Sequence, residues 1–528
     1  MPSTFQQPRF AHRPPPRPSG TEEAALAIVG GGLVGLTIAL DLARQGIRSV
    51  LLDEDDTVST GSRAICFAQR TMQVMGRLGL GRRFLDKGVT WNRGRVFFGN
   101  RQAYEFDLLP ESGHEYPAFV NLQQYYAEQW LVEACAATGL VDLRWRHRVT
   151  AIENAPDGAL LAVETPHGPY RLHAEWLLAC DGARSVLRES LGLPFTGQVF
   201  RDRFLIADVL MQAEFPTERW FWFDPPFHPG QSVLLHKQPD DVWRIDFQLG
   251  WEADPEAEKD PARVRWRVEQ MLGPDVPFDL EWVSVYTFRC RRMERFRHGR
   301  IFFLGDAAHQ VSPFGARGGN SAVQDADNLA WKLAAFLKGE APAALLDSYD
   351  AERVPAADEN ILNSTRSTDF ITPKNPAARA YRDAVLELAE DLPFARPLVN
   401  SGRLSRPATL GHSPLNGPDE RPDAAPPGTP CPDAPVGRGD WLLRHLGQDW
   451  ALVAREAHPV AIPGIRPVIL TDTPRTGALH DHAGLAARRL GLLPGECALV
   501  RPDQHIAARF ATCAPETILA AHRKAMGR

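Results

Sequence analysis

The stretch Ala27-Ile28-Val29-Gly30-Gly31-Gly32-Leu33-Val34-Gly35 decides the fold of this 528-residue chain. Its apolar start predicts a β-strand, and its Gly-x-Gly-x-x-Gly pattern predicts a tight turn into a helix over 33–45. Gly30 permits the turn, Gly32 lets a pyrophosphate approach the backbone, and Gly35 lets the helix pack closely on the strand. The N-terminus of that helix offers free N–H groups and the positive end of its dipole to the phosphates.

A second strand, over 49–52, follows this helix and leads to Asp53, which lies 18 residues beyond Gly35. A carboxylate near this spacing accepts the ribose hydroxyls of an adenine dinucleotide. The order strand, helix, strand and acid therefore predicts a dinucleotide site rather than an ordinary glycine-rich turn. Residues 24–40 carry no charge, but glycines interrupt them and they are shorter than the roughly 20 residues that cross a bilayer, which argues against a membrane helix.

Composition excludes several classes of function. The chain has 59 Lys and Arg against 65 Asp and Glu and shows no basic block, so no nucleic-acid partner is expected. Its seven cysteines are scattered, with no Cys-x-x-Cys pair and no metal-ligand spacing, which indicates reduced thiols in a cytoplasmic protein and no metal site. Residues 1–20 are rich in Pro and Arg and lack an apolar stretch, so we expect a disordered lead-in rather than a secretory signal.

Patterns of hydrophobicity divide the rest of the chain. Residues 91–120 and 196–289 alternate apolar and polar positions and are rich in aromatic residues, which predicts strands. Helical spacing predicts a long helix over about 321–336. The Pro-rich segment 401–436 predicts a semi-extended linker, and 437–528 alternates strand and helix patterns, which predicts a small separate α/β domain.

Two further motifs resemble those of the flavoprotein aromatic hydroxylases, the single-component group A monooxygenases. Residues 180–188 (CDGARSVLR) resemble the "DG" motif of that family, and residues 304–313 (LGDAAHQVSP) resemble its "GD" motif. The run 314–333 (FGARGGNSAVQDADNLAWKL) continues as those enzymes do. Together with the glycine-rich turn, the motifs occur in the family's order across residues 24–355.

The resemblance implies an α/β fold with a Rossmann-type FAD-binding domain, an inserted β-sheet substrate domain and a C-terminal thioredoxin-like domain. The FAD-binding domain is expected to be discontinuous. The expected ranges are 21–90, 121–195 and 290–400 for the FAD-binding domain, 91–120 and 196–289 for the substrate domain, 401–436 for the linker and 437–528 for the C-terminal domain. Because that last domain lacks a Cys-x-x-Cys pair, a structural or oligomerising role is implied, such as a homodimer, and not a redox role.

The resemblance also implies the chemistry. An FAD-dependent monooxygenase of this kind hydroxylates a small phenolic substrate with O2 by way of a flavin C4a-hydroperoxide, and NADH or NADPH visits as a transient reductant. The chain is similar to 3-(3-hydroxyphenyl)propionate and phenol hydroxylases. An aromatic polyketide-tailoring hydroxylase and a non-catalytic flavin-binding redox sensor stay open. A flavin-dependent halogenase is disfavoured, because Trp220-Phe221-Trp222-Phe223 is not followed by the Ile-Pro of those enzymes.

By resemblance, Asp306 accepts the ribityl hydroxyls of the flavin, and Pro313 lies by the reacting flavin carbon, where its missing N–H removes one donor. His309 is expected either to support this loop or to pack in the core, and with Pro313 it forms the expected catalytic pair. The other residues expected at the cofactor are Gly30, Gly32, Gly35, Asp53, Arg63, Gln123, Asp181, Gly305, Gly318, Gly319 and Asn320. The side chains that could meet the phenolic hydroxyl are Tyr126, Arg219, His228 and His236.

Overall fold

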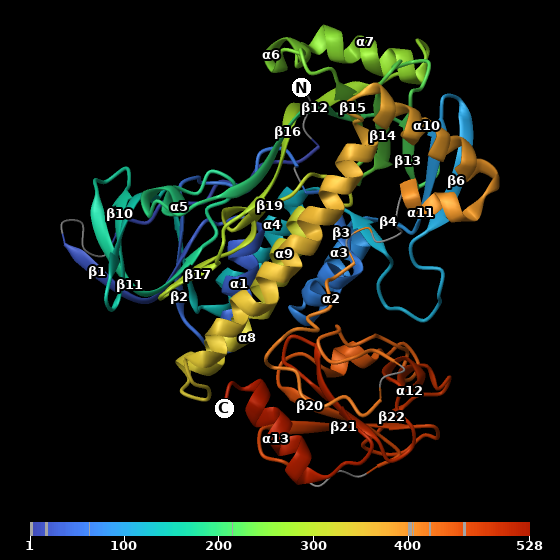
Figure 1. Cartoon of the computed structure of the whole chain (residues 1–528). Coiled ribbons are helices and arrows are strands. Elements are labelled where there is room, and N and C mark those ends of the chain that lie inside the picture. Colours follow the sequence, from blue (N-terminus) through green and yellow to red (C-terminus); the bar gives the residue numbers. More distant parts are fainter. Residues whose placement is uncertain are drawn as a thin grey trace.

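The computed structural model describes residues 4–15, 20–62, 64–213, 215–399, 404, 406–421, 424–457 and 461–528. Strands in this part of the chain form four sheets, around which the helices pack (Figure 1). The predicted β-α-β unit is present as β1 (Thr21–Val29), α1 (Leu33–Arg44) and β2 (Ser49–Asp53). It lies at the centre of the first sheet, because β1 pairs with β2 on one side and with β11 (Tyr170–Ala179) on the other. No helix among the described residues is both long and apolar enough to cross a bilayer.

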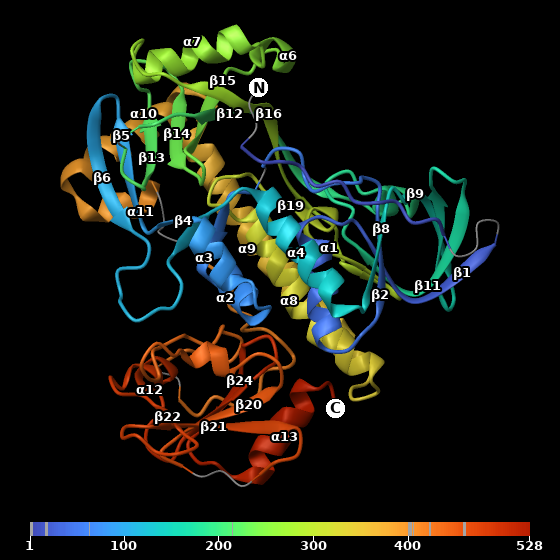
Figure 2. The same cartoon turned by 180° about the vertical axis from the view of Figure 1, so that it is seen from behind.

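The first sheet is largely parallel. Its order is β17, β18, β11, β1, β2 and β8, and the strands from β18 to β8 run parallel. Strand β10 pairs antiparallel with β11, and β9 pairs antiparallel with β10. Its other strands are β8 (Val141–Trp145), β9 (Arg148–Ala155), β10 (Gly158–Glu164), β17 (Arg297–His298) and β18 (Ile301–Phe303). Helix α1 packs against both α4 (Gln124–Thr138) and α8 (Gly318–Leu337), and the three helices share one apolar core with this sheet (Figure 2).

The second sheet has eight strands in the order β19, β16, β12, β15, β14, β13, β5 and β6. Its pairings are antiparallel except that of β13 with β5. The strands are β5 (Arg93–Phe98), β6 (Arg101–Asp107), β12 (Thr196–Leu210), β13 (Arg219–Phe223), β14 (Ser232–Lys237), β15 (Val242–Leu249), β16 (Asp279–Arg292) and β19 (His309–Gln310). Segments far apart in the sequence, 91–120 and 196–289, therefore contribute to one sheet.

The two faces of this second sheet pack against different helices. Its outer face meets α7 (Pro261–Leu272), which follows α6 (Pro255–Glu258) and contributes Val264 and Val268 to the apolar cluster there. Its inner face packs against α9 (Ala344–Ile371) and α10 (Pro376–Asp391), where Phe223 and Leu234 join Ile371 and Leu386. The smaller elements are β3 (Cys66–Ala68), α2 (Gln69–Arg77), α3 (Gly81–Lys87), β4 (Val89–Trp91), β7 (Phe119–Asn121), α5 (Val186–Ser190) and α11 (Arg396–Val399).

The C-terminal unit, residues 406–528, has its own mixed sheet in the order β22, β21, β20, β23 and β24. Its elements are β20 (Trp450–Arg455), β21 (Ile465–Thr471), β22 (Leu479–His480), α12 (Leu485–Leu490), β23 (Cys497–Val500), β24 (Ile506–Phe510) and α13 (Pro515–Ala525). The described part of the Pro-rich segment, which its composition predicts to be a semi-extended linker, is hydrogen-bonded to the C-terminal unit. The N–H groups of Gly428 and Cys431 donate to the carbonyls of Ile506 and Gln504, each at 2.7 Å, so the segment lies along β24.

Two more expectations differ from the structure. Residues 4–15, expected to be disordered, pack on the fold because Phe5 stacks on Tyr125 and Phe10 on Trp145, with ring centroids 4.2 and 4.4 Å apart. Helix α8 begins at Gly318, three residues earlier than predicted. Gly318 and Gly319 therefore belong to its first turn.

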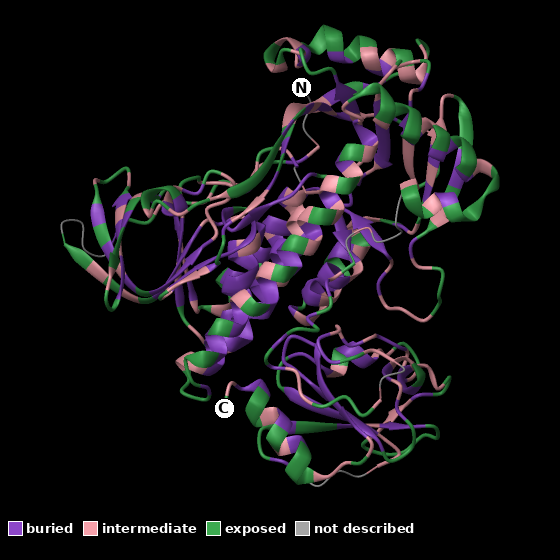
Figure 3. Ribbon diagram, in the orientation of Figure 1, coloured by how far each residue is buried: buried purple, intermediate pink, exposed green. Residues whose placement is uncertain are grey.

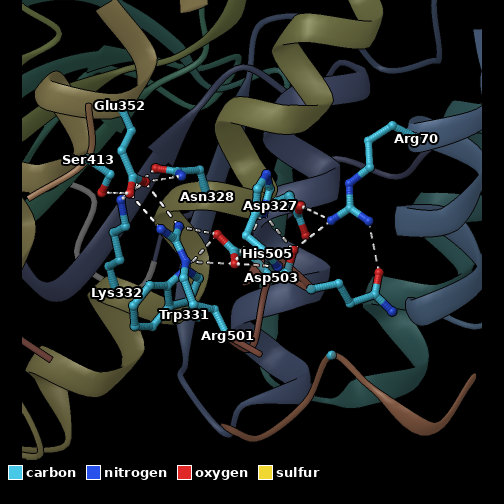
Figure 4. Close-up of polar contacts among 12 residues, drawn as sticks. Arg70, Asp327, Asn328, Trp331, Lys332, Glu352, Ser413, Arg501, Asp503 and His505 are labelled. Atoms are coloured by element: carbon cyan, nitrogen blue, oxygen red, sulfur yellow. Dashed lines mark hydrogen bonds and ion pairs between the residues drawn. The ribbon is translucent and has the colours of Figure 1, made fainter. Parts of the chain in front are cut away.

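Helix α8 is buried over most of its length (Figure 3). Its middle holds an ion network with the turn between β23 and β24 of the C-terminal unit (Figure 4). Arg501 from that turn donates to both carboxylate oxygens of Glu352 on α9, at 2.6 and 3.0 Å, and pairs with Asp503 at 2.5 Å. Lys332 on α8 also binds Glu352, at 2.6 Å, and burial lowers the pKa of Lys332 to about 8.

The same network extends from α8 to α2. Asp327 on α8 accepts hydrogen bonds from Arg70, at 2.8 Å, and from Arg77, at 2.7 Å. Arg70 also donates to the carbonyl of Asp503 at 2.7 Å, and Trp331 donates to the Asp503 carboxylate at 3.0 Å. The turn of the C-terminal unit is therefore inserted among α2, α8 and α9, with Arg501 paired to Glu352 of α9 and the carbonyl of Asp503 bound by Arg70 of α2.

Arg501→Met is expected to destabilise the protein, because it leaves Asp503 and Glu352 buried without their shared cation. Breaking a buried pair on one side costs about 3–5 kcal/mol. We expect a clearly lower melting temperature for the purified protein. The control is Arg82→Met, which removes an exposed pair with Asp86 and should leave melting unchanged. Equal melting of the two variants would show that the network adds no stability.

Candidate cofactor and substrate site

Four residues of the sequence motifs lie at the same edge of the first sheet. Gly30 follows β1, Asp53 ends β2, Asp181 comes shortly after β11, and Gly305 comes shortly after β18. These strands are neighbours and run parallel, so their carboxyl ends lie side by side. The structure thus brings together motifs that are up to 275 residues apart in the sequence. In open α/β sheets, this edge is where ligands bind.

The three motif glycines of the first turn are required for different reasons. Gly30 has a φ of +106°, and a Cβ there would lie 2.3 Å from the carbonyl oxygen of Cys180. A Cβ on Gly35 would lie 1.9 Å from the carbonyl oxygen of Gly30. A Cβ on Gly32 would meet only Glu128, with its Oε1 at 3.6 Å. Packing therefore demands glycine at positions 30 and 35. At position 32 it leaves a space that a ligand can approach.

The N-terminus of α1 begins at this space, and Gly32 at its N-cap position provides no side-chain cap. An uncapped helix start offers N–H donors and positive dipole potential to a phosphate. One of these donors, the N–H of Leu33, is directed at Glu128 Oε1 at 3.2 Å. The turn, the uncapped helix and the open position at Gly32 fit the diphosphate of a dinucleotide.

Asp53 stands beside this turn and is held by it. Its Oδ2 accepts from the N–H of Gly31 at 2.5 Å, and its Oδ1 accepts from the N–H of Asp55 at 2.8 Å. Burial raises the pKa of Asp53 to about 6, even though these two hydrogen bonds lower it. The carboxylate is thus positioned at the strand end where the sequence predicts an acceptor for ribose.

Gln123 and its neighbour point in different directions. The side-chain amide of Gln123 donates to the carbonyl of Pro239 at 3.1 Å, toward the second sheet. Gln124 accepts from the N–H of Ala64 at 3.0 Å and donates to Glu128 at 2.8 Å. Gln124 and Glu128, both missed by the sequence reasoning, therefore support the glycine-rich turn. Their spacing of four residues on one helix face is the signal that could have identified them.

The loop after β18 is held by Asp325 of α8. Its Oδ2 accepts from the N–H of Gly305 at 3.0 Å and contacts Nε2 of His309 at 2.7 Å, while Arg353 binds its Oδ1 at 2.7 Å. Burial alone would raise the pKa of Asp325, but His309 and Arg353 bring it below its ordinary value. His309 is 2% exposed. The structure thus places it as a support of the loop, and its burial argues against contact with a substrate.

The tip of this loop is more open. Asp306 and Pro313 are exposed, and Gly318 and Gly319 begin α8 without a side-chain cap at its N-terminus. Asn320 behaves differently, because its side chain is buried and makes four hydrogen bonds within the protein. These bonds go to the N–H of Ala68, the hydroxyl of Thr71 and the carbonyls of Cys66 and Ala316. The Asn320 side chain therefore joins α8 to β3 and α2, which leaves only its main chain for a cofactor.

Two motif residues predicted at this edge of the sheet are Asp181 and Arg63. Asp181 is half-buried, and its Oδ2 accepts from the N–H of Leu187 at 3.0 Å, so the carboxylate caps the start of α5. Burial raises the pKa of Asp181 above its ordinary value. Arg63, predicted to lie along the cofactor, falls outside the described residues.

The four candidates for contact with a substrate do not lie together. Tyr126 donates its hydroxyl to Asp240 at 2.7 Å, and His228 contacts the carbonyl of Gln248 at 2.6 Å on the side of α6 and α7. Arg219 and His236 belong to the neighbouring strands β13 and β14 and interact electrostatically with Cys66 of β3. The structure thus separates Tyr126 and His228 from the other two.

The sequence of this chain matches known flavoproteins. The FAD binding domain family matches residues 23–364. The 6-methylpretetramide 4-monooxygenase of Streptomyces rimosus is 32% identical over 94% of this chain and 92% of its own. The 3-(3-hydroxy-phenyl)propionate/3-hydroxycinnamic acid hydroxylase of Mycobacterium sp. (strain JLS) is 30% identical over 83% of this chain and 77% of its own.

A solved structure shares the fold over nearly the whole chain. The flavin-dependent monooxygenase PieE, crystallised with FAD and substrate, superposes with a TM-score of 0.78 at 22% identity, covering 95% of this chain and 99% of that one. The fold, the glycine-rich turn and the sequence matches lead to one conclusion: this chain belongs to the family of FAD-dependent monooxygenases.

Proposed function

We propose that this chain hydroxylates the ring of a phenol with O2 and takes its electrons from NADH or NADPH. The observation that supports this most is the convergence of Gly30, Asp53, Asp181 and Gly305 at one sheet edge. An extended dinucleotide such as FAD needs a phosphate-binding turn, an acid for ribose and further contacts along the same edge. The relatives named as hydroxylases support the extension from FAD binding to ring hydroxylation.

The motif residues have separate proposed tasks. Gly32 and the N-terminus of α1 bind the diphosphate, and Asp53 accepts a hydrogen bond from the ribose. Asp306 accepts from the ribityl chain, and the N–H groups of Gly318 and Gly319 face the flavin ring, where the α8 dipole stabilises negative charge. When bound, FAD supplies the redox chemistry that passes electrons from the nicotinamide to O2.

Other residues stay as proposals at the same site. Pro313 is exposed at the tip of the loop, so its ring can lie by the flavin without offering an N–H donor. Asp181 lies at the edge where the cofactors meet, and Arg63 is proposed to lie along the flavin. The aromatic inner face of the second sheet, which includes Phe221 and Phe223, would exclude water from the reacting atoms.

The division into domains is part of the proposal. We assign the second sheet as the substrate domain. Its two predicted parts, 91–120 and 196–289, join in one sheet, where β5 and β6 extend β12–β16. The C-terminal unit is thioredoxin-like in fold and structural in role, which its mixed sheet supports. All seven cysteines, each within the described residues, are free thiols.

A second candidate substrate is a polycyclic phenol. The relative from Streptomyces rimosus, named for 6-methylpretetramide, matches over a larger share of both chains than the phenylpropionate hydroxylase does. A polyketide-tailoring reaction would use the same flavin site and differ in the size of the ring system that the second sheet accepts.

Turnover by the purified protein tests the proposed activity. Purified protein with FAD should oxidise NADH or NADPH faster when a suitable phenol is added, and the product should gain one oxygen atom. The measurement is cofactor absorbance with product mass in the same tubes, over simple phenols, hydroxyphenylpropionates and polycyclic phenols. Faster oxidation without a new product would contradict hydroxylation of that phenol, and the absence of any response would favour a flavin-binding sensor.

The glycine-rich turn gives a matched pair of variants. Gly32→Ala should fold normally and lose FAD, because its Cβ meets no close protein atom but occupies the approach to the diphosphate. Gly35→Ala should fold poorly, because its Cβ would overlap the carbonyl of Gly30. The measurements are the ratio of flavin to protein absorbance and the melting temperature, with Gly250→Ala as control in open space. A fully yellow Gly32→Ala protein would exclude the proposed diphosphate position.

The pKa of Asp53 predicts how FAD binding depends on pH. Only the ionised carboxylate accepts hydrogen bonds through both oxygens, and burial raises the pKa of Asp53 to about 6. FAD affinity should therefore be constant above that pH and weaken as the pH falls below it, because Asp53 must then release a proton to bind ribose. Titration of FAD-free protein from about pH 5 to about pH 8 measures this. Asp53→Asn should bind more weakly and without this pH dependence.

A further inference from the structure

A row of charged side chains crosses the inner face of the second sheet. Asp208 on β12 pairs in register with Arg244 on β15, which pairs with His236 on β14. Trp220 pairs with Leu235, which brings Arg219, one residue earlier on β13, beside His236. We call Asp208, Arg244, His236 and Arg219 the polar row. Asp246, two residues beyond Arg244, points to the same face.

Half of this row is a satisfied ion pair. Arg244 donates from Nε and Nη2 to the two carboxylate oxygens of Asp208, each at 2.7 Å, and also binds the carbonyl of Ser62 at 2.5 Å. Both members of the pair are buried. Asp208 and Arg244 therefore compensate each other, and the chemistry of the other half depends on Arg219, His236 and Asp246.

That other half has three buried polar atoms that no described residue satisfies. They are Nη1 of Arg219, Nε2 of His236 and Oδ1 of Asp246. The His236 side chain is 4% exposed, and its Nε2 stands 3.8 Å from Oδ2 of Asp246, too far for a direct hydrogen bond. Buried polar groups in folded proteins are nearly always paired, so three unpaired atoms on neighbouring strands indicate a position for a polar group that is not part of the chain.

One residue, Cys66, connects the polar row to the first turn of α8. Its thiol contacts Nδ1 of His236 at 3.9 Å, and its carbonyl accepts from the side chain of Asn320, in the first turn of α8, at 2.8 Å. The first turn of α8 is where we place the flavin ring. Cys66 thus links the polar row to that turn, with Nδ1 of His236 toward Cys66 and Nε2 left for a ligand.

We propose that Arg219, His236 and Asp246 bind the ionising hydroxyl of a phenolic substrate, and that His236 is the group that removes its proton. This rests on the proposed function. The O–H bond of the phenol breaks, its proton moves to Nε2 of His236, and its electron pair stays on the oxygen beside Arg219 Nη1. Asp246 offsets the charge of the imidazolium. The ring then carries the electron density that an electrophilic oxygen requires, and a substrate without a free hydroxyl is excluded.

The groups around His236 favour this transfer. Burial lowers the pKa of His236, but the Asp246 carboxylate and the Cys66 thiol outweigh burial and raise it above its ordinary value. Arg219 opposes them and Arg244 is compensated by Asp208. A stronger base accepts a phenolic proton more readily, and it is most effective when its pKa lies near the operating pH.

The test compares His236→Gln with His228→Gln, which removes a histidine of the same sheet domain on the opposite side. The substrates are the phenol selected by the turnover panel and an analogue with several ring fluorines, whose hydroxyl is ionised at the pH of the assay. His236→Gln should retain FAD and lower the hydroxylation rate of the parent phenol by about 100-fold. The analogue, already ionised in solution, should regain most of that rate. His228→Gln should match the wild-type protein with both.

A second variant gives an independent readout. Asp246→Asn should lower the pKa of His236, so the acidic limb of the rate–pH profile should move to lower pH. An unmoved limb, or equal rates for His236→Gln and His228→Gln, would overturn the assignment while phenol hydroxylation itself stands. If no phenol stimulates the wild-type protein, the proposed function has failed first, and the proton transfer fails with it.

Discussion

The pairing of buried charges along α8 is the constraint on which the rest of the structure depends. Asp325 binds His309 and Arg353, and two residues later Asp327 binds Arg70 and Arg77. A buried carboxylate is costly unless its partners stay in place, so each pair restricts the position of the helix. The first pair secures the loop after β18, and the second joins α2. The glycines in the first turn of α8 therefore reach the cofactor edge from a helix whose position is set by charges farther along it.

The local parts of this site could be predicted from sequence, and the pairs between distant segments could not. The turn at Gly30–Gly35 and the acid at Asp53 depend on contacts within one β-α-β unit, where spacing specifies geometry. His309 and Asn320 lie in equally recognisable motifs, yet their side chains bond to Asp325 and to β3 within the protein. A motif identifies the position of a residue along the chain, whereas burial and partners decide whether its side chain faces a ligand.

Composition misled in a related way in the two Pro-rich segments, at the start of the chain and within residues 401–436. Proline lacks an N–H and breaks regular structure, so Pro-rich segments predict an absence of helices and strands. That absence does not imply loose packing. The remaining N–H groups of Gly428 and Cys431 still pair with the backbone beside β24, and Phe5 and Phe10 in the Pro-rich start stack on aromatic rings of the folded chain. Two or three well-placed residues suffice to hold such a segment on the surface of a domain.

Strand β15 shows why the substrate side was the least predictable. Arg244, Asp246 and Gln248 alternate with Trp243, Ile245 and Phe247, a pattern that normally places the polar residues in water. Here the apolar residues pack toward α7, and the polar ones face inward, where Arg244 is 2% exposed. Period-two alternation distinguishes the two faces of a strand but does not reveal what covers the polar one. Because the rest of the chain covers this face of the sheet, its charged residues are buried and not solvated. A buried, charged face of this kind can both exclude water and recognise an ionisable hydroxyl.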